Sequence, residues 1–437
     1  MKFKTLITTL LITINCFTQS LDTSFSDDGK LLLENIGVFK ETIVQDDGKV
    51  LFTGKNEENY GTVFRLNTDG TYDHTFGTQG KLILTTTGNL TRPHINSDGS
   101  YFIYDGNNHL IKLFNDGTVD NSFNNTSFGG QDYVVLSTGK IVAIDSKHTL
   151  KRYNSDGTID SSYGTNGILT VFSQGQKIVR IEVNPATDDI YILDSGSSNA
   201  NYKVWKLFSD NTLNNSPFIQ GSFVWTTDFR FYDNKLYLSG HKSPSLNSRL
   251  TKLGIDDLNV LQLTSVDRND FIPRNKLSFQ ENGTAVQLLR HYVDQYNYNI
   301  KINLFDNDYS NTNLITANFP EIEYFDDGFI ASDNFLNKIY FVSGGYNNIF
   351  IARFNYSTLS INESEMNKIK IWPNPIENIV NFSTDFKTGE IYSIDGKQVL
   401  LNIRGTSLDI TNLSKGIYIL KGIDIYDRNI NLKIVRK

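Results

Sequence analysis

Short runs in which hydrophobic and polar residues alternate fill most of this chain, and each run follows a polar turn. Clear examples are Asp47–Gly54, Asp98–Gly106, Thr138–Ile144 and Asn234–Gly240. Alternation with a period of two, in residues such as Val, Ile, Tyr and Phe, is typical of β-strands, and Asp-Gly or Asn-Gly turns are typical of hairpins. Residues 21–355 show no helical periodicity of any length. This part of the chain is therefore predicted to be all-β.

A longer phrase that contains one of these turns repeats along the same region. Arg65–Thr71 returns as Lys112–Thr118, as Arg152–Thr158 and, in altered form, as Lys206–Thr212. The turn aspartates of six copies are 47, 40, 54, 46 and 50 residues apart; they are Asp69, Asp116, Asp156, Asp210, Asp256 and Asp306. Four short strands in about 40–50 residues make one blade of a β-propeller. With a degenerate seventh copy at Arg353–Asn355, the repeats predict a propeller of seven four-stranded blades.

A blade this small cannot bury both of its faces, so its neighbours in the ring must complete its core. An aromatic residue recurs after the turns and is expected to wedge between blades (Phe25, Phe76, Phe123, Tyr163 and Phe218). Strands of the first unit are expected at Lys30–Asn35, Lys40–Gln45, Lys49–Lys55 and Thr62–Asn67. Five turn aspartates follow a Lys or Arg by four positions. That cation either lines a ligand-facing surface or, as its regular recurrence favours, pairs with a nearby carboxylate.

Bulk properties narrow the class of protein. Aromatic residues make up 12% of the 437 residues, which excludes a disordered chain. Lys2, Lys4 and the apolar stretch Leu6–Phe17 predict a secretory signal at residues 1–20, and no comparable stretch follows, so no transmembrane segment is expected. Cleavage there changes the formal net charge from −7 to −9 and removes Cys16, the single cysteine. An acidic, exported protein without disulfides is predicted, and nucleic acid is not expected as a partner.

The repeats stop after Asn355, and a polar segment at 356–367 predicts a linker. Residues 368–437 then contain short strands at 8–12-residue spacing with Pro and Gly turns, which predicts a small β-sandwich. Their motifs are Trp372-Pro373-Asn374-Pro375, a Tyr-x-x-x-Gly396-Lys397 segment, Leu-x-x-Gly416-Ile-Tyr418 and a Lys/Arg-rich end.

This combination of motifs resembles the type A C-terminal sorting domain of the type IX secretion system of Bacteroidetes bacteria. The resemblance implies that the export machinery recognises the domain on a periplasmic intermediate. It further implies that the domain is removed and that the protein is released or attached to the outer-membrane surface. An ordinary appended sandwich with a binding role of its own is the alternative.

The repeats also resemble a known family. Leu21–Phe25 with Gly29-Lys30, and Tyr72–Gly77 with Gly80-Lys81, are similar to the delta-sixty repeat of secreted bacterial propeller proteins. The similarity is good over 21–167 and fades afterwards. It supports the fold and leaves the function open, because that family has no established shared activity.

No catalytic set is evident in the sequence. The six histidines are dispersed, no Gly-x-Ser-x-Gly elbow occurs, and neither catalytic nor cofactor-binding residues are predicted. Ser137-Thr-Gly-Lys140, Ser209-Asp-Asn211 and Lys387-Thr-Gly389 match the three motifs of serine penicillin-recognising enzymes in order. The first two fall in predicted β-turns, whereas that chemistry needs the Ser and Lys at a helix start. We interpret these matches as chance.

Two candidate binding features remain. Asp306, Asp308 and Ser310 place oxygen ligands at alternate positions, as calcium loops do, although turn residues of this kind also bond their own backbone amides. A site is expected where copies differ, and His291, Tyr292, Tyr296 and Tyr298 form a divergent, aromatic-rich stretch. These aromatics either stack on sugar rings or cap a blade.

The sequence therefore predicts a secreted or cell-surface, non-catalytic propeller that binds a glycan or a protein. Two alternatives remain open. One is a carbohydrate-active enzyme whose carboxylates converge at the central channel, which two carboxyl groups ~5–10 Å apart would favour. The other is a structural matrix component.

Overall fold

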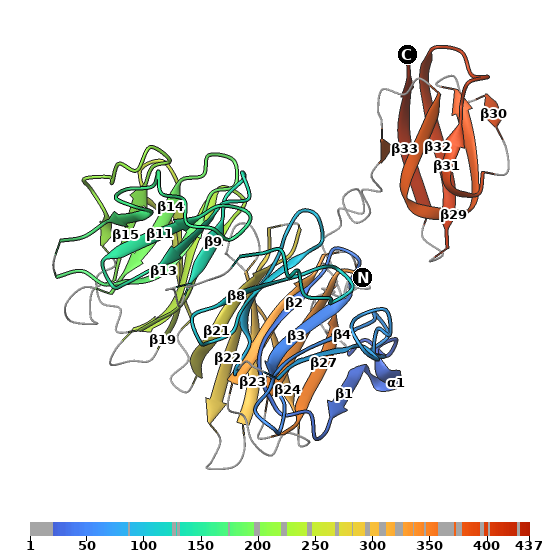
Figure 1. Cartoon of the computed structure of the whole chain (residues 1–437). Coiled ribbons are helices and arrows are strands. Elements are labelled where there is room, and N and C mark those ends of the chain that lie inside the picture. The colour runs from blue at the N-terminus through green and yellow to red at the C-terminus, as the bar shows by residue number, and fades with distance from the viewer. Residues whose placement is uncertain are drawn as a thin grey trace, which may run out of the picture. The chain divides into compact units, whose positions relative to one another are not determined.

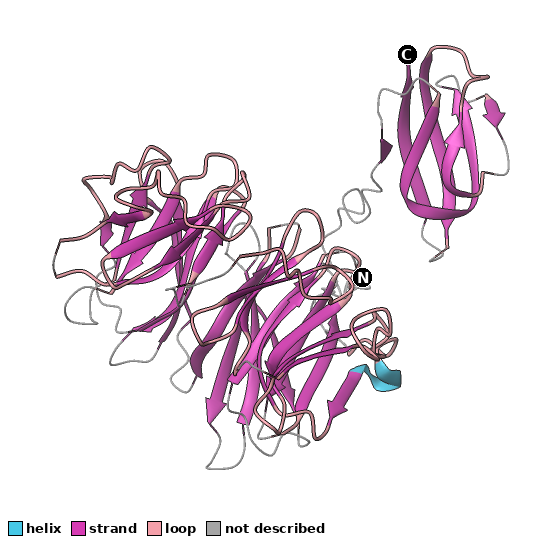
Figure 2. Ribbon diagram, in the orientation of Figure 1, coloured by secondary structure: helices cyan, strands magenta, loops and turns pink. Residues whose placement is uncertain are grey.

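The computed structural model divides into two units, Met1–Ser357 and Thr358–Lys437, and each is considered by itself. The residues it describes are 21–85, 88–124, 128, 132–173, 175–195, 202–219, 225–242, 247–266, 271–281, 283–292, 298–305, 312–319, 327–334, 336–344, 347–356, 371–372, 378–393, 397–400, 403–425 and 429–437. Among them the single helix is the short α1 (Ser26–Gly29), and nearly everything else is strand or turn (Figure 2). No helix within these ranges is long and apolar enough to cross a membrane.

Seven antiparallel sheets make up the first unit (Figure 1). Blade 1 is β2 (Val38–Val44), β3 (Val50–Lys55), β4 (Gly61–Leu66) and β5 (Lys81–Leu84). Blade 2 has three described strands, β6 (Thr91–Ile95), β7 (Tyr101–Tyr104) and β8 (Leu110–Leu113). Blade 3 is β9 (Tyr133–Val135), β10 (Ile141–Ile144), β11 (Thr149–Tyr153) and β12 (Ile168–Thr170). Blade 4 is β13 (Ile178–Val183), β14 (Ile190–Asp194), β15 (Lys203–Leu207) and β16 (Phe218–Ile219).

The last three blades have longer strands. Blade 5 is β17 (Trp225–Tyr232), β18 (Lys235–Lys242), β19 (Asn247–Gly254) and β20 (Val260–Val266). Blade 6 is β21 (Phe271–Phe279), β22 (Ala285–Tyr292), β23 (Tyr298–Phe305) and β24 (Thr312–Asn318). Blade 7 is β25 (Asp327–Asp333), β26 (Lys338–Gly344), β27 (Ile349–Asn355) and β1 (Lys30–Leu33). The prediction of an all-β, seven-bladed propeller is confirmed.

Hydrophobic clusters between consecutive blades show why the ring is stable. Each of seven buried clusters draws its side chains from two adjacent blades, and one of them joins blade 7 to blade 1. In that cluster Phe39 and Phe52 of blade 1 pack with Phe329 and Tyr340 of blade 7. Burying apolar surface stabilises by roughly 25 cal/mol per Å². The blades thus shield one another from water, and the ring is complete.

The order of strands corrects one detail of the sequence interpretation. Lys30–Leu33 was expected in the first unit, but it pairs antiparallel with β27, from Lys30 opposite Ala352 to Leu33 opposite Ile349. The prediction was wrong because pairing across the two ends of the ring is non-local and leaves no local signal. The N-terminal strand therefore closes the propeller as the outer strand of blade 7.

The recurring turns and aromatics act as expected between the first blades. The Asp69 carboxylate accepts hydrogen bonds from the Thr71 N–H at 2.9 Å and hydroxyl at 2.7 Å, which fixes the turn. Gly117, at φ +82°, lies so close to the Phe76 ring that a Cβ there would be 2.8 Å from Cε2. A side chain at this turn position would therefore push the aromatic wedge away.

The second unit is a six-stranded sheet that encloses a core of its own. It comprises β28 (Ile371–Trp372), β29 (Ile379–Ser393), β30 (Gln398–Leu400), β31 (Gly405–Asp409), β32 (Gly416–Asp424) and β33 (Asn429–Arg436). The first half of β29 pairs with β31 and the second half with β32, with register shifts at Phe386. Phe386 is buried in the core with Phe382 and Ile391. The unit is thus a small, independently packed β-domain.

A candidate ligand pocket between blades 3 and 4

An ion pair with a buried carboxylate lies beneath each of the first three repeated turns. The cation of the repeat pairs with the aspartate eight residues later, and the turn aspartate itself serves only as a cap. Arg65 is 2.7 Å from Asp73, Lys112 is 3.3 Å from Asp120, and Arg152 is 2.7 Å from Asp160. The expectation that this residue pairs with a nearby carboxylate is confirmed.

In two blades the same guanidinium also contacts the next blade. Arg65 Nη1 donates to the Asn115 carbonyl oxygen at 2.6 Å and to the Tyr101 hydroxyl at 3.0 Å. Arg353 Nη1 donates to the Thr68 carbonyl oxygen of blade 1 and to the Tyr340 hydroxyl of its own blade. A carbonyl of the following blade thus satisfies a buried arginine donor at both interfaces.

A backbone hydrogen bond closes three successive interfaces at the same place. Ser26 N–H donates to the Asp69 carbonyl, Gly77 to Asp116 and Asn124 to Asp156, at 2.7–3.0 Å. At each of them the turn glycine that follows the aspartate (Gly70, Gly117 or Gly157) lies against the aromatic wedge of the preceding blade. Glycine is therefore what allows these blades to meet.

The interface between blades 3 and 4 differs at this position. Asn211, at φ 70°, stands where the first three copies have glycine. Among the bonds of the described residues, none joins Gly164 to Asp210 in the way that Gly77 joins Asp116. At the equivalent Gly70 and Gly117 a Cβ would lie 2.8–3.0 Å from the wedge ring, so a side chain at this position competes with the ring for space. Between blades 3 and 4, Tyr163 and Asn211 both line a pocket of about 180 Å³.

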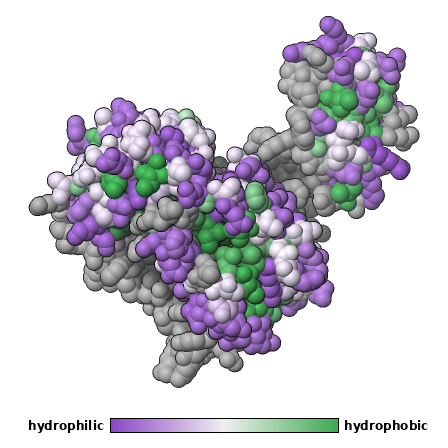
Figure 3. Space-filling view, in the orientation of Figure 1, coloured by the Kyte–Doolittle hydropathy of each residue, from purple (hydrophilic) through white to green (hydrophobic). Residues whose placement is uncertain are grey.

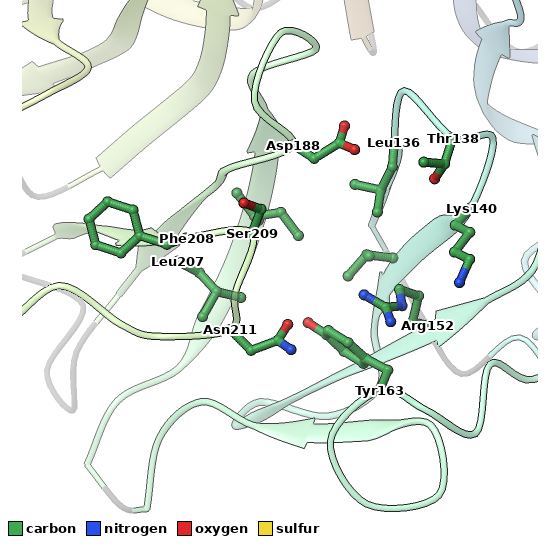
Figure 4. A pocket seen from close by; sticks show the side chains of 12 residues that line it. Leu136, Thr138, Lys140, Arg152, Tyr163, Asp188, Leu207, Phe208, Ser209 and Asn211 are labelled. Carbon is green, nitrogen blue, oxygen red and sulfur yellow. The ribbon is translucent and has the colours of Figure 1, made fainter.

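Both blades supply the pocket's lining (Figure 4). Blade 3 provides Leu136, Thr138, Lys140, Val142, Arg152 and Tyr163, and blade 4 provides Asp188, Ile190, Leu207, Phe208, Ser209 and Asn211. The Tyr163 hydroxyl points toward Asn211, and the Arg152 guanidinium lies beside the tyrosine ring. At the opposite rim the Ser137 N–H and hydroxyl donate to Asp188 at 2.7 and 2.8 Å. The pocket is thus hydrophobic on its strand side and polar at its inner end and rim.

Two polar groups in the pocket have unused hydrogen-bonding capacity. Tyr163 is 1% exposed, and its hydroxyl has no hydrogen-bond partner among the described residues. The Arg152 guanidinium lies 4.3 Å from the centre of the Tyr163 ring; Nε donates to Asp160 at 2.7 Å and Nη2 reaches Ser162 at 3.5 Å. Within the described residues Nη1 makes neither of the bonds that its counterparts in Arg65 and Arg353 make. An unpaired buried polar group such as the Tyr163 hydroxyl is costly, so a pocket that contains one suits a polar ligand.

The charges beneath the pocket are fixed. Asp160 accepts from both Lys140 Nζ at 2.8 Å and Arg152 Nε at 2.7 Å. Burial alone would raise the pKa of Asp160, but hydrogen bonds from Lys140, Ser162 and Arg152 outweigh it and hold the pKa well below its ordinary value near 3.8. Burial raises the pKa of Tyr163, so its hydroxyl stays protonated. The inner end of the pocket therefore has two cations, one carboxylate and a neutral O–H donor.

A second cluster of charges lies on the innermost strands of the blades. The backbone N–H of one blade donates to an acidic or hydroxyl side chain of the preceding blade, at 2.6–3.2 Å. The pairs are Ile181 with Asp132, Phe231 with Glu182, Leu277 with Asp228, and Ser332 with Ser278. A β-bulge immediately precedes Asp228 on β17, and such bulges re-aim side chains. These acceptors recur from blade to blade, so their first role is to join the ring.

Arg230 brings two of these carboxylates together. Its Nη1 is 3.6 Å from Glu182 Oε1 and its Nε is 3.2 Å from Asp228 Oδ2. Burial raises the pKa of Glu182 to about 7. The positive charge of Arg230 lowers this pKa, and the negative charge of Asp132 raises it further. The Asp228 side chain is fully buried, whereas 22% of the Glu182 side chain is exposed. Only one carboxylate of this pair can therefore meet a solute.

The structure describes only some of the candidate binding residues that were predicted from the sequence. Asp306, Asp308, Ser310 and Tyr296 lie outside the described residues, as do the predicted signal and all of the predicted linker after Tyr356. His291 and Tyr292 end β22, and Tyr298 begins β23 directly opposite Tyr292. No group of three potential metal ligands occurs within the described part of the chain.

The sorting motifs fall on the second unit. Trp372 is in β28, while Pro373, Asn374, Pro375 and Gly396 lie outside the described residues. The Lys397 carbonyl accepts from the Ser393 N–H at 2.8 Å. Gly416 begins β32, and the hydroxyl of the buried Tyr418 donates to the Ser414 carbonyl at 2.7 Å. Lys397, Gly416 and Tyr418 thus lie in or beside turns that position the strands.

The first two penicillin-recognising motifs meet at the pocket, but without the enzyme's geometry. The Ser137 hydroxyl donates to Asp188, and Asp160 holds the Lys140 ammonium group. The lysine is thus not placed to activate the serine.

Sequence reasoning missed Arg152, Tyr163 and Asn211 as site residues. The signal was present in the fourth copy, which reads Asp-Asn-Thr where the first three copies read Asp-Gly-Thr. Weighed together with Tyr in place of Phe at position 163, it would have indicated an altered interface between blades 3 and 4.

Comparisons with known proteins agree with the two-part organisation. Residues 370–436 match the family described as a secretion system C-terminal sorting domain, and residues 45–76 match a β-propeller domain of unknown function. No curated protein matches the chain.

Among solved structures, the extracellular domain of the putative one component system BT4673 from B. thetaiotaomicron is 11% identical, with a TM-score of 0.48 over 92% of this chain and 57% of that one. The extracellular domain of the putative hybrid two component system BT3049 from the same organism is 11% identical, with a TM-score of 0.45 over 94% of this chain and 58% of that one. BamB from Moraxella catarrhalis is 10% identical, with a TM-score of 0.40 over 75% of this chain and all of that one. The chain spans less than two thirds of the two B. thetaiotaomicron domains.

Fold and matches together define the class of protein, a β-propeller followed by a sorting domain. More particularly, it is a Bacteroidetes-type propeller protein whose type IX sorting domain directs it to secretion or to the cell surface. On the face seen in Figure 3 the described residues are largely hydrophilic, with one continuous hydrophobic patch on the propeller and smaller ones elsewhere.

Proposed function

We propose that this protein is a non-catalytic, extracellular binding protein whose ligand enters the pocket between blades 3 and 4. The observation that carries the proposal is the buried Tyr163 hydroxyl, which has no partner among the described residues and faces a pocket of about 180 Å³. Ligand pockets combine apolar walls with a few polar groups that fix orientation. The pocket is small, so its occupant is a compact group, such as one sugar unit of a glycan or one side chain of a protein.

Binding without catalysis fits the chemistry of the lining. The Lys140 ammonium is held by Asp160, the Ser137 hydroxyl by Asp188, and no pair of free carboxylates is present among the lining residues. A glycosidase needs two carboxyl groups that both reach the substrate. The pocket supplies hydrogen bonds and shape, and these are the requirements of recognition.

The experiment is a glycan and peptide array probed with the mature propeller and with Asn211→Gly, each with and without chelator. Asn211→Gly introduces the glycine of the first three copies and should let Tyr163 close the pocket. We expect ligands that bind the native propeller and lose binding in this variant. If every ligand on the array binds both proteins equally, the pocket is not the binding site and the proposal fails. Binding that chelator abolishes would instead support a calcium site.

The carboxylates of Glu182 and Asp228 favour a second candidate, a carbohydrate-active enzyme. Glu182 and Asp228 contact the same guanidinium, and the pKa of Glu182 is raised as a general acid requires. Against it, Asp228 is fully buried and bonded to Leu277. Hydrolysis of any glycan by the native propeller, abolished in Glu182→Gln, would establish this activity and overturn the non-catalytic proposal.

A further inference from the structure

The interface between blades 1 and 2 and the interface between blades 7 and 1 are each closed by a hydrogen bond that the pocket lacks. In blades 1 and 7 the repeat arginine donates Nη1 to a carbonyl oxygen of the next blade, from Asn115 or Thr68. Blade 3 has the same arginine, Arg152, paired with its aspartate in the same way. The pocket therefore stands where a carbonyl oxygen of blade 4 would otherwise accept from the guanidinium.

We infer that an oxygen of a bound carboxylate takes the place of this missing carbonyl, so that the pocket selects ligands that carry a carboxylate group. The inference rests on the proposed binding function and names the ligand class. One carboxylate oxygen accepts from Arg152 Nη1 and the other from the hydroxyl of Tyr163, whose ring lies against the guanidinium (Figure 4). Hydrogen bonds between an arginine and a carboxylate are among the strongest that proteins make.

The charge balance favours an anion over a neutral acceptor. Lys140 and Arg152 share a single carboxylate, that of Asp160, which leaves one uncompensated positive charge at the inner end of the pocket. Asp188 lies at the opposite rim, where Ser137 donates to it. Lys206 and Asp189 neutralise each other at 3.2 Å behind the wall. A ligand carboxylate would therefore complete a balanced group of two cations and two anions.

The rest of the lining indicates the body of the ligand. Leu136, Val142 and Ile190 offer an apolar wall, and Ser209 and Asn211 offer polar groups on the blade 4 side. A compact ring with one apolar face and several hydroxyl groups matches both surfaces. A hexuronic acid, as a free sugar or as the end unit of an acidic glycan, has this combination, and glucuronate is therefore the probe.

Calorimetric titration of the mature propeller with glucuronate, with glucose and with acetate tests the inference. We expect glucuronate to bind at least ~10-fold more tightly than glucose, and acetate to compete weakly for the same site. Binding should weaken as salt increases, because Arg152 makes a charged contact. Methyl glucuronate glycoside would separate recognition of a chain end from recognition of the free sugar.

Variants then locate the contact. Tyr163→Phe removes one donor and should weaken glucuronate several-fold while leaving glucose unchanged, and Arg152→Lys should remove the preference for the acid. Tyr101→Phe is the matched control, because it removes a buried hydroxyl next to Arg65 at a closed interface and should leave binding unchanged. Circular dichroism melting of each variant shows that loss of binding is not loss of fold.

Each outcome has a distinct meaning. Equal binding of glucuronate and glucose, both lost in Asn211→Gly, would overturn the carboxylate inference and leave the pocket as a binding site. Array ligands that lack a carboxylate and lose binding in Asn211→Gly would also overturn the carboxylate inference and leave the pocket as a binding site. Failure of every ligand to distinguish Asn211→Gly from the native protein would overturn the proposed function itself.

Discussion

Arg353 Nε donates to the Asp22 carboxylate at 2.7 Å, and this contact joins residues 331 positions apart in the chain. Lys338 Nζ lies 3.2 Å from the same carboxylate, and Arg353 is almost completely buried. The pair lies beside the junction of β1 with β27, where the ends of the ring meet. Asp22 thus belongs to blade 7 in space although it precedes blade 1 in sequence.

Asp22→Asn should markedly destabilise the propeller. The change keeps the shape of the side chain but leaves Arg353 buried without a countercharge, and removing one partner of a buried ion pair costs about 3–5 kcal/mol. Urea denaturation of the mature protein measures the free energy of unfolding. Asp28→Asn is the control, since its pair with Lys30 is 3.8 Å long and exposed and is worth less than ~1 kcal/mol. Equal effects of the two substitutions would show that the ring does not depend on this closure.

The turn glycines should matter for space as well as for backbone conformation. Gly117 and Gly175 both have positive φ, +82° and +77°, but a Cβ at 117 would lie 2.8 Å from Phe76, whereas one at 175 meets nothing within 4 Å. Gly175→Ala should cost about 1–2 kcal/mol for the left-handed backbone alone. Gly117→Ala should cost about 1–3 kcal/mol more, because the wedge must move. Thermal unfolding of both variants tests this, and similar losses would contradict the steric role of the wedge.

Local patterns were enough to predict the blades but not the site. Alternation and turn spacing gave seven sheets because each hairpin is local, and the paired cations followed from their recurrence. The assignment of Lys30–Leu33 to blade 7 and the meeting of Glu182 with Asp228 depend on contacts between distant segments. The sequence shows Asn211 as a departure from the Asp-Gly-Thr of the first three copies. Its consequence requires knowing that the Phe76 ring covers the equivalent Gly117.

Acid should weaken the ion pairs beneath the turns. The pKa values of Asp73 and Asp160 are held below their ordinary value near 3.8 by hydrogen bonds and cations that outweigh burial. A lowered folded-state pKa contributes stability that is present above pH ~4 and is lost as the pH falls further. Asp160→Asn should therefore flatten the pH dependence of unfolding below pH 4, whereas Asp27→Asn, at an exposed position, should leave it unchanged. Parallel curves for the native protein and Asp160→Asn would show that Asp160 ionises alike in both states.

Glu182 should have the opposite pH dependence. Its folded-state pKa is raised to about 7 by burial, above the value of an unfolded glutamate near 4.5. Its contribution to stability is therefore complete below pH ~4.5 and declines as the pH rises to ~7, by at most about 3 kcal/mol. Glu182→Gln keeps an oxygen for the Phe231 N–H and should lack this decline. Urea unfolding between pH 4 and 8 measures the difference, and the exposed Glu58→Gln is the control. A native curve that rises over this interval relative to Glu182→Gln would refute the assignment.

The sorting domain should be needed for export but not for folding of the propeller. Its core, which includes Val380, Ile391 and Leu420, is formed within residues 371–437 and is separate from the clusters between blades. Truncation after Asn367 should therefore leave a propeller with native thermal stability that accumulates in the periplasm. Ile391→Asp places a charge in the fully buried core, so the full-length variant should also stay in the periplasm. This variant tests whether export needs the folded domain or only a chain of full length. Cell fractionation with immunoblotting measures both, and normal secretion of the truncated protein would disprove the role of this domain.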